Sequence, residues 1–132
     1  MRINSQVDVE QIRREARALA VSAGCDRADV EAIVLAVSEL ATNLVRYAPG
    51  GEVVVATCAQ GCARGIAIES RDGGPGIADV AQALGDGFST GGGLGSGLPA
   101  VRRLMDDFTL TTSPAGTRIV ARKWVSGPSP SR

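Results

Sequence analysis

The chain has 132 residues, which is the size of one domain and enough to bury roughly two thirds of the unfolded surface without help from disulfides. Its 14 basic and 14 acidic residues cancel, and no basic run with interleaved aromatic residues marks a surface for nucleic acid, so we expect no such partner. The longest apolar run, 32–37, is far too short to cross a bilayer, and the N-terminus has no signal-peptide pattern. These features predict a cytoplasmic protein with no membrane segment.

Three cysteines and no histidine limit the chemistry further. An odd number of cysteines argues against a disulfide framework and for reduced thiols. Cys58 and Cys62 stand four residues apart, but only Cys25 could join them, so a tetrahedral zinc site would lack its fourth soft ligand. We interpret all three as small buried residues. Without histidine, Ser-His-Asp and Cys-His catalysis are excluded, as is an autophosphorylated histidine.

The first third of the chain predicts one short strand and two helices. Residues 1–7 alternate weakly and predict an edge strand. A capping-box-like pattern starts at Asp8, and apolar residues recur at helical spacing as far as Gly24, which predicts a first helix over 8–24. A longer apolar arc predicts a second helix over 27–48. As the longest element, this second helix must lie on a sheet.

A hairpin and a glycine-rich stretch follow. The β-branched runs 52–59 and 65–71 predict an antiparallel hairpin. Residues 72–98 then hold ten of the 17 glycines, with room for a helical turn or two over 78–84.

The last third predicts a third helix and a second hairpin. The helix covers 98–105, with Pro99 tolerated in its first turn, and the strands cover 108–112 and 117–125. Residues 126–132 predict a disordered tail. This order of elements predicts one α+β domain over 1–125, a two-layer sandwich with helices on one face of a mixed, mainly antiparallel sheet of four or five strands.

The glycine-rich stretch lies between two well-patterned halves, which is typical of a binding loop, and we interpret it as part of a nucleotide site. The chain has no P-loop motif. A loose dinucleotide-binding pattern over 95–100 has neither a strand immediately before it nor an acidic residue about 20 positions downstream.

Glu39 and Asn43 are four residues apart on the second predicted helix, so they share a face that points away from the apolar arc. A solvated helix face is the simpler interpretation. However, an asparagine amide oxygen can ligate Mg²⁺ bound to phosphates. A glutamate one turn earlier could then take a proton from an attacking hydroxyl group or water.

Asp72 ends a strand and begins a turn, where carboxylates are common. Gly74 and Gly76 leave room for a flat ring, so this carboxylate could accept a hydrogen bond from the exocyclic amine of adenine. The glycine-rich residues 93–97 precede a helix N-terminus, which favours phosphate, although a plain linker is the alternative. Thr117, at the start of the last strand, is more often a strand residue than a ligand.

Taken together, four motifs resemble, in order and spacing, the nucleotide-binding boxes of the GHKL ATPase and kinase superfamily: Glu39-Leu-Ala-Thr-Asn43, Asp72-Gly-Gly-Pro-Gly76, Gly93-Leu-Gly-Ser-Gly97 and Gly116-Thr117. Within that superfamily, the block from 86 to 108 and Lys123-Trp124 resemble the RsbT-type serine/threonine kinases, the switch kinases of bacterial stressosome or partner-switching modules. The resemblance covers nearly all of residues 8–125.

This resemblance implies a kinase that uses ATP and Mg²⁺ to phosphorylate serine or threonine on small STAS-domain proteins and that, once released, binds and activates a PPM-type phosphatase. It also implies that Glu39 is the catalytic base, that Asn43 ligates Mg²⁺ and that Asp72 holds adenine. The other nucleotide-binding residues that it implies are Gly74, Gly76, Ile77, Gly93, Leu94, Gly95, Ser96, Gly97, Leu98 and Thr117. Residues 78–92 would be the lid.

A second function stays open at this point. The chain could be an ATP-binding anti-sigma or partner switch, whose output is stoichiometric binding to a phosphatase or σ factor rather than catalysis. Apolar residues on the first helix could also support a homodimer, although such residues more often pack on the sheet.

Overall fold

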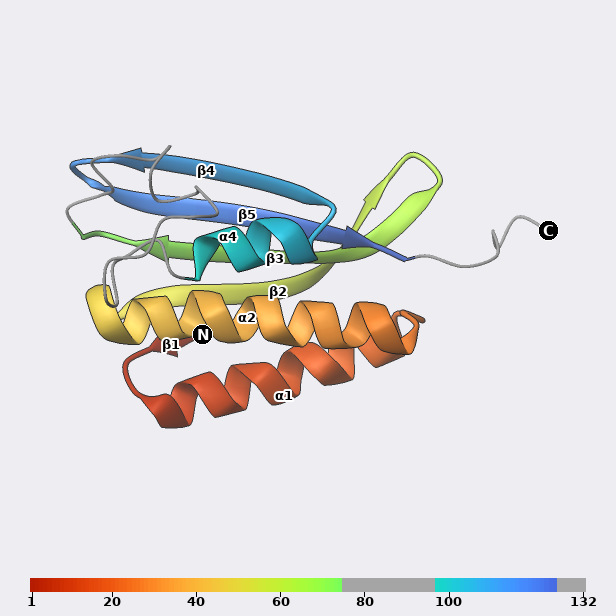
Figure 1. Cartoon of the computed structure of the whole chain (residues 1–132), viewed down its shortest axis with the longest axis horizontal. Helices are drawn as coiled ribbons and strands as arrows, with labels where there is room; N and C mark the ends of the chain where they lie inside the picture. The colour runs from red at the N-terminus through yellow and green to blue at the C-terminus, as the bar shows by residue number, and fades with distance from the viewer. Residues whose placement is uncertain (75–96, 126–132) are drawn as a thin grey trace.

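A computed structural model of the chain describes residues 1–74 and 97–125 (Figure 1). Its elements are, in chain order, β1 (Arg2–Ile3), α1 (Gln6–Ser22), α2 (Arg27–Tyr47), β2 (Gly51–Gln60), β3 (Ala63–Asp72), α4 (Leu98–Leu104), β4 (Asp107–Ser113) and β5 (Gly116–Trp124). The strands form one sheet in the order β1-β2-β3-β5-β4, and each of these neighbouring pairs is antiparallel. The predicted α+β class is confirmed. The predicted helical turn over 78–84 and the tail over 126–132 lie outside the described residues.

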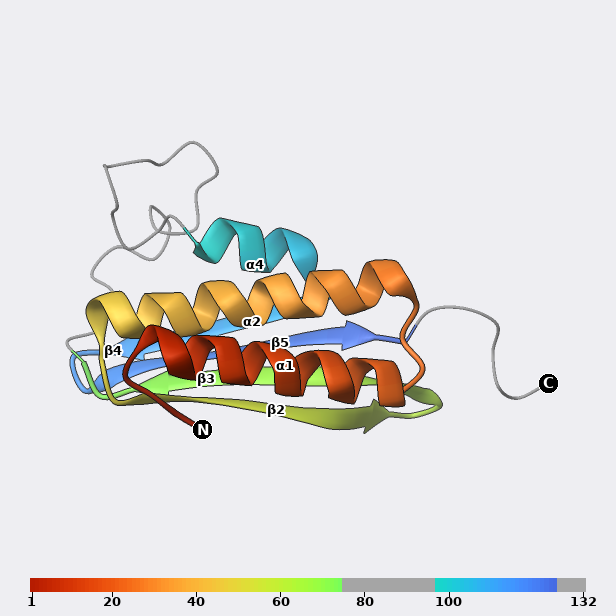
Figure 2. The same ribbon diagram turned by 90° about the horizontal axis from the view of Figure 1, so that it is seen from below.

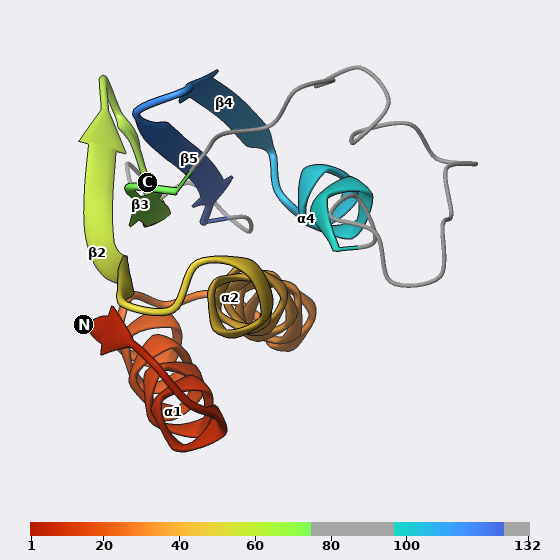
Figure 3. The same ribbon diagram turned by 90° about the vertical axis from the view of Figure 1, so that its left-hand side faces the viewer.

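The helices lie on one face of the sheet, as Figures 2 and 3 show from two directions. In the middle of this layer, α2 packs against α1 on one side and α4 on the other, and it contacts β2 and β3 beneath it. This is the two-layer sandwich that the order of elements predicted. None of the described helices is both long enough and apolar enough to span a bilayer.

The start of α1 differs from the prediction. The helix begins at Gln6 with Ser5 as its N-cap, two residues earlier than expected. The Asp8 carboxylate accepts hydrogen bonds from the backbone N–H groups of Asn4, at 2.9 Å, and Ser5, at 3.3 Å. Asp8 is therefore the N3 residue of the capping box, three positions after the N-cap, and not the N-cap itself. Because the helix starts so early, the strand predicted over 1–7 is reduced to the two residues of β1.

The bounds of α2 and of both hairpins agree closely with the prediction. The N-cap of α2 is Asp26, whose carboxylate accepts a hydrogen bond from the backbone N–H of Asp29 at 2.8 Å. The first hairpin extends further than expected because its turn contains only Gly61 and Cys62. Cys62 is exposed at this turn, and Cys25 and Cys58 are only half-buried, so the expectation that the three cysteines are buried is wrong.

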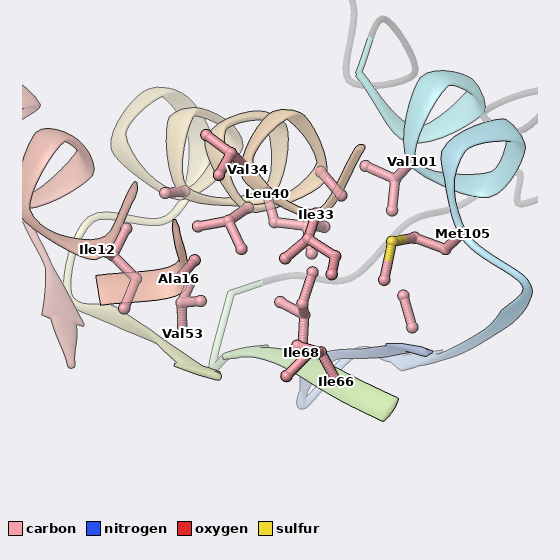
Figure 4. Close-up of a cluster of buried hydrophobic side chains, with 14 of the residues drawn as sticks. Ile12, Ala16, Ile33, Val34, Leu40, Val53, Ile66, Ile68, Val101 and Met105 are labelled. Carbon is pink, nitrogen blue, oxygen red and sulfur yellow. The ribbon is translucent and has the colours of Figure 1, made fainter. Parts of the chain in front are cut away.

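The core lies between the helix layer and the inner face of the sheet, and all three helices contribute to it (Figure 4). Its labelled members are Ile12 and Ala16 of α1, Ile33, Val34 and Leu40 of α2, Val53, Ile66 and Ile68 of the first hairpin, and Val101 and Met105 at α4. At the surface, the Arg17 guanidinium donates hydrogen bonds of 2.6 and 3.1 Å to the Glu31 carboxylate and thereby joins α1 to α2. This bond lowers the pKa of Glu31.

Two leucines on α2 test how far this core stabilises the fold. Leu40 is 1% exposed and Leu35 is 50% exposed. We expect Leu40→Ala to lower the free energy of unfolding by about 2–5 kcal/mol, because it removes buried methyl groups and leaves a cavity. Leu35→Ala makes the same chemical change on the same helix and should cost less than about 1 kcal/mol. Urea unfolding of both variants measures the difference, and equal losses would contradict the placement of α2.

Candidate functional site

The described candidate residues come from four elements, and in Figure 1 α2 and β3 end on the left, where β5 begins. The second half of α2 carries Glu39 and Asn43, β3 ends with Asp72, α4 begins after Gly97, and β5 begins next to Thr117. These elements are far apart in the sequence, and the antiparallel sheet with its helix layer brings their ends together. Six other predicted residues lie outside the described ranges, namely Gly76, Ile77, Gly93, Leu94, Gly95 and Ser96.

Glu39 and Asn43 lie against the start of α4. Both are half-buried, whereas Gly97 is fully buried beside them. A Cβ atom on Gly97 would lie 2.6 Å from Glu39 Oε1, 3.4 Å from Asn43 Nδ2 and 3.5 Å from Asn43 Oδ1. This part of α2 is therefore not a solvated helix face, because α4 covers it. A side chain at position 97 would therefore displace the Glu39 carboxylate from its present position.

Asp72 is held in place by the turn that follows β3. Its Oδ1 atom accepts a hydrogen bond of 2.8 Å from the backbone N–H of Gly74, two residues further on. This is the bond by which an aspartate mimics a backbone turn. Across the sheet, Asp72 is the register partner of Thr117. The adjoining Gly116 has a φ of +149°, and a Cβ atom there would overlap the Asp72 carbonyl oxygen. Glycine at 116 thus lets the start of β5 close on the end of β3.

Thr117 is buried, and its hydroxyl group lies 2.9 Å from that of Thr112. The two threonines face each other across the β4–β5 hairpin as register partners. Thr112 was not predicted as a site residue. The sequence carries a signal for Thr112, because the position of a tight turn sets which residues of the two strands pair, and Thr112 and Thr117 are equally distant from this turn.

Gly51, at the start of β2, is a second residue that the sequence analysis missed. A Cβ atom there would lie 2.7 Å from Leu44 Cδ2, 2.8 Å from the Arg71 carbonyl oxygen and 3.1 Å from Asp72 Cβ. Gly51 therefore allows the last turn of α2 to approach Asp72. The glycine pair at 50 and 51, directly after the predicted second helix, is the local signal that could have found it.

Two open hollows adjoin Asp72 in the described part of the chain. One, of about 510 Å³, has Gly51, Asp72 and Gly74 among its lining residues. The other, of about 270 Å³, has Asp72 and Thr117 among its lining residues. Asp72 thus presents its carboxylate where a ligand of moderate size can reach it.

The oxygen atoms of Glu39 and Asn43 beside Gly97 could contribute to a cation site. No group of three or more histidine, cysteine, aspartate or glutamate residues within 1–74 and 97–125 could hold a metal ion alone. A cation bound here would therefore take most of its oxygen ligands from its substrate and from water. Mg²⁺ binds in this way, through one or two protein oxygens together with substrate phosphates, and the amide oxygen of Asn43 is suitably placed near the Glu39 carboxylate.

Comparison with known proteins gives concordant matches. The model of the histidine kinase-like ATPase domain family matches residues 4–123. Serine/threonine-protein kinase RsbT of Bacillus subtilis (strain 168) is 41% identical over 126 residues, which cover 95% of each chain.

Two solved structures share the fold at low sequence identity. One contains the RsbU and RsbW domains of Rv1364c from Mycobacterium tuberculosis, with a TM-score of 0.67 and 19% identity over 98% of this chain and 32% of that one. The other is the histidine kinase AdeS of Acinetobacter baumannii, with a TM-score of 0.53 and 16% identity over 96% of this chain and 68% of that one.

Gly116 and Gly73 provide a test of the contact at Asp72. We expect Gly116→Ala to lower the free energy of unfolding by about 1–3 kcal/mol or more, since one strained backbone position alone costs about that much. Position 116 has a φ of +149°, and the new Cβ atom would also overlap the Asp72 carbonyl oxygen. At Gly73, a Cβ atom meets nothing within 4 Å, so Gly73→Ala should change stability little. Chemical unfolding of the two variants gives the comparison. If Gly116→Ala were as stable as Gly73→Ala, the close approach of β5 to Asp72 would be wrong.

Proposed function

This chain belongs to the family of histidine kinase-like ATPase domains and is a serine/threonine-protein kinase of the RsbT type, and we propose that it transfers the γ-phosphoryl group of ATP to STAS-domain proteins. The contact of Gly97 with Glu39 and Asn43 supports this proposal most directly. It joins a carboxylate and an amide oxygen to the end of the glycine-rich stretch at one place. Phosphoryl transfer needs such an arrangement, because positioning and charge stabilisation supply most of its rate.

We propose Glu39 as the catalytic base. Its half-buried carboxylate lies beside Gly97 and could accept the proton of a serine or threonine hydroxyl group as the hydroxyl oxygen attacks the γ-phosphorus atom. The bond between that phosphorus atom and the β–γ bridging oxygen then breaks, and ADP leaves. Because Gly97 has no side chain, it gives the Glu39 carboxylate its room.

We propose Asn43 as the protein ligand for Mg²⁺, one turn after Glu39. An ion held there would supply positive charge that offsets the negative charge of the phosphates. The half-buried amide of Asn43 supplies a neutral oxygen at this place. A neutral ligand leaves the nearby Glu39 as the carboxylate that accepts the proton.

We propose that the other end of the site holds adenine. Asp72 would accept a hydrogen bond from the exocyclic amine of adenine, and Gly74 would line the ring. Thr117, whose hydroxyl group is hydrogen-bonded to that of Thr112, would support Asp72 from the neighbouring strand. The remaining residues that we propose for nucleotide binding are Gly76, Ile77, Gly93, Leu94, Gly95, Ser96, Gly97 and Leu98.

We propose that phosphorylation of a STAS-domain protein releases the kinase, which then binds and activates a PPM-type phosphatase. The 41% identity to a curated RsbT over 95% of both chains supports this role in a partner-switching module. ATP as the phosphate donor fits a cytoplasmic location. The direct test incubates the purified chain with γ-labelled ATP, Mg²⁺ and the STAS-domain proteins encoded beside it. If ATP binds and no STAS protein acquires label, stoichiometric partner binding replaces catalysis as the function.

Glu39→Gln tests the assignment of the base. We expect it to slow labelling of the STAS protein by roughly 10²- to 10⁴-fold, the usual contribution of a general base, while the affinity for ATP stays nearly unchanged. Glu31→Gln is the matched control on the same helix, because Glu31 is exposed and bonded to Arg17. Labelling rates and nucleotide affinity are measured for both variants. Transfer by Glu39→Gln at near the wild-type rate would mean that Glu39 is not the base.

Asn43→Ala should have a different signature. Because it removes the proposed metal ligand, we expect the gain in ATP affinity on adding Mg²⁺ to shrink, and labelling to fall with it. Titration of ATP with and without Mg²⁺, measured by calorimetry on the wild type and on Asn43→Ala, gives the comparison. An unchanged response to Mg²⁺ in the variant would remove Asn43 from the metal site.

A further inference from the structure

Lys123 lies near the C-terminal end of β5, whereas Thr117 lies near the start of the same strand. The side chain of Lys123 is 17% exposed. Its Nζ atom donates a hydrogen bond of 2.9 Å to the carbonyl oxygen of Leu104, the last residue of α4. The same nitrogen lies 3.5 Å from Asp106 Oδ1 and 3.9 Å from Asp29 Oδ1. One ammonium group thus contacts the end of α4, the link between α4 and β4, and the first turn of α2.

The link after α4 is fixed to β5 on both sides of Lys123. The backbone N–H of Asp106 donates to the Arg122 carbonyl oxygen at 2.8 Å. The second carboxylate oxygen of Asp106 accepts from the backbone N–H of Trp124, also at 2.8 Å. These bonds place Asp106 so that its first oxygen faces Lys123, and the ammonium group then connects this fixed point to α2.

The opposite end of α4 carries the contact on which the site depends. With seven residues, α4 is about 10 Å long at 1.5 Å per residue. Such a short helix moves as one body. A shift of its last carbonyl group along α2 therefore shifts Gly97 by a similar amount, and a Cβ position on Gly97 is only 2.6 Å from Glu39 Oε1.

We propose that Lys123 is a positioning residue for phosphoryl transfer. It sets the position of α4 along α2, and through α4 it sets the fit of Gly97 against Glu39 and Asn43. This inference rests on the proposed function, because it gives Lys123 an effect on the step for which Glu39 is the base. Lysine suits the place, since its compact ammonium group has three hydrogen-bond donors and meets three oxygen atoms, those of Leu104, Asp106 and Asp29.

The test compares Lys123→Met, which keeps the apolar stem, with Lys123→Arg, which keeps the charge. At a temperature well below unfolding, we expect Lys123→Met to lower kcat by roughly 10- to 100-fold, in line with the cost of misplacing a reacting group by about 1 Å. The KM for ATP should change less than kcat, and Lys123→Arg should recover much of the loss. Arg118→Met is the control, since it removes a cation of the same strand that is bonded to Glu69 on the surface. Its kcat should stay near that of the wild type.

Amide hydrogen exchange over 39–43 and 97–104 gives a second measurement that does not need activity. Faster exchange in Lys123→Met than in Arg118→Met at both segments supports the inference, even if no STAS protein proves to be a substrate. Lower thermal stability of Lys123→Met with an unchanged kcat would overturn it and leave Lys123 a purely structural role. If Lys123→Met does not fold, Asp106→Asn takes its place, and a kcat within twofold of the wild type in that variant would also overturn the inference.

Discussion

The packing of α2 between α1, the sheet and α4 is the constraint on which the rest of the structure depends. Eight of the 21 residues of α2 are buried, and they form an arc wide enough to contact neighbours on three sides. Burial of this arc fixes both the rotation and the position of the helix. The rest of the helix surface includes a polar strip, and α4 covers part of it. Glu39 and Asn43 lie on this strip, so the same packing that stabilises the fold also fixes the two side chains most suited to chemistry.

Close approach at three glycines then brings the other elements to that strip. Gly51 lets the last turn of α2 approach Asp72, Gly116 lets β5 close on the end of β3, and Gly97 lets α4 lie on Glu39 and Asn43. At each of these positions a Cβ atom would meet a neighbour at a distance that real structures do not show. The elements of the site thus approach one another most closely at glycines, where the absence of a side chain leaves room for the contact.

Periodicity in the sequence was sufficient to predict the helices, the two hairpins and the α+β class. Local signals are less reliable for the start of a helix. They favour Asp8 as the first residue of the capping box, whereas the structure has Ser5 there, because both residue types favour a cap. Glu39, Asn43 and Asp72 were predicted as site residues from motifs, but their surroundings could not be. The contacts of Gly51 with Asp72, and of Lys123 with Asp29, join residues distant in the sequence, and no local pattern encodes them.

The charged groups that surround α4 differ between its two ends. At the end near Leu104, two carboxylates and a carbonyl group surround Lys123, so this contact is satisfied within the protein. At the other end, the atoms nearest to a Cβ position on Gly97 belong to the Glu39 carboxylate and the Asn43 amide. A phosphate group that approached Glu39 would meet like charge, and at short range this repulsion amounts to several kcal/mol. A cation bound with the nucleotide relieves it. If Glu39 is the base and Asn43 the metal ligand, as we propose, binding of the nucleotide depends on its metal ion, whereas a lysine at this place would pair with the base. Lys123 instead places its charge at the other end of α4, where oxygen atoms of Leu104, Asp106 and Asp29 surround it.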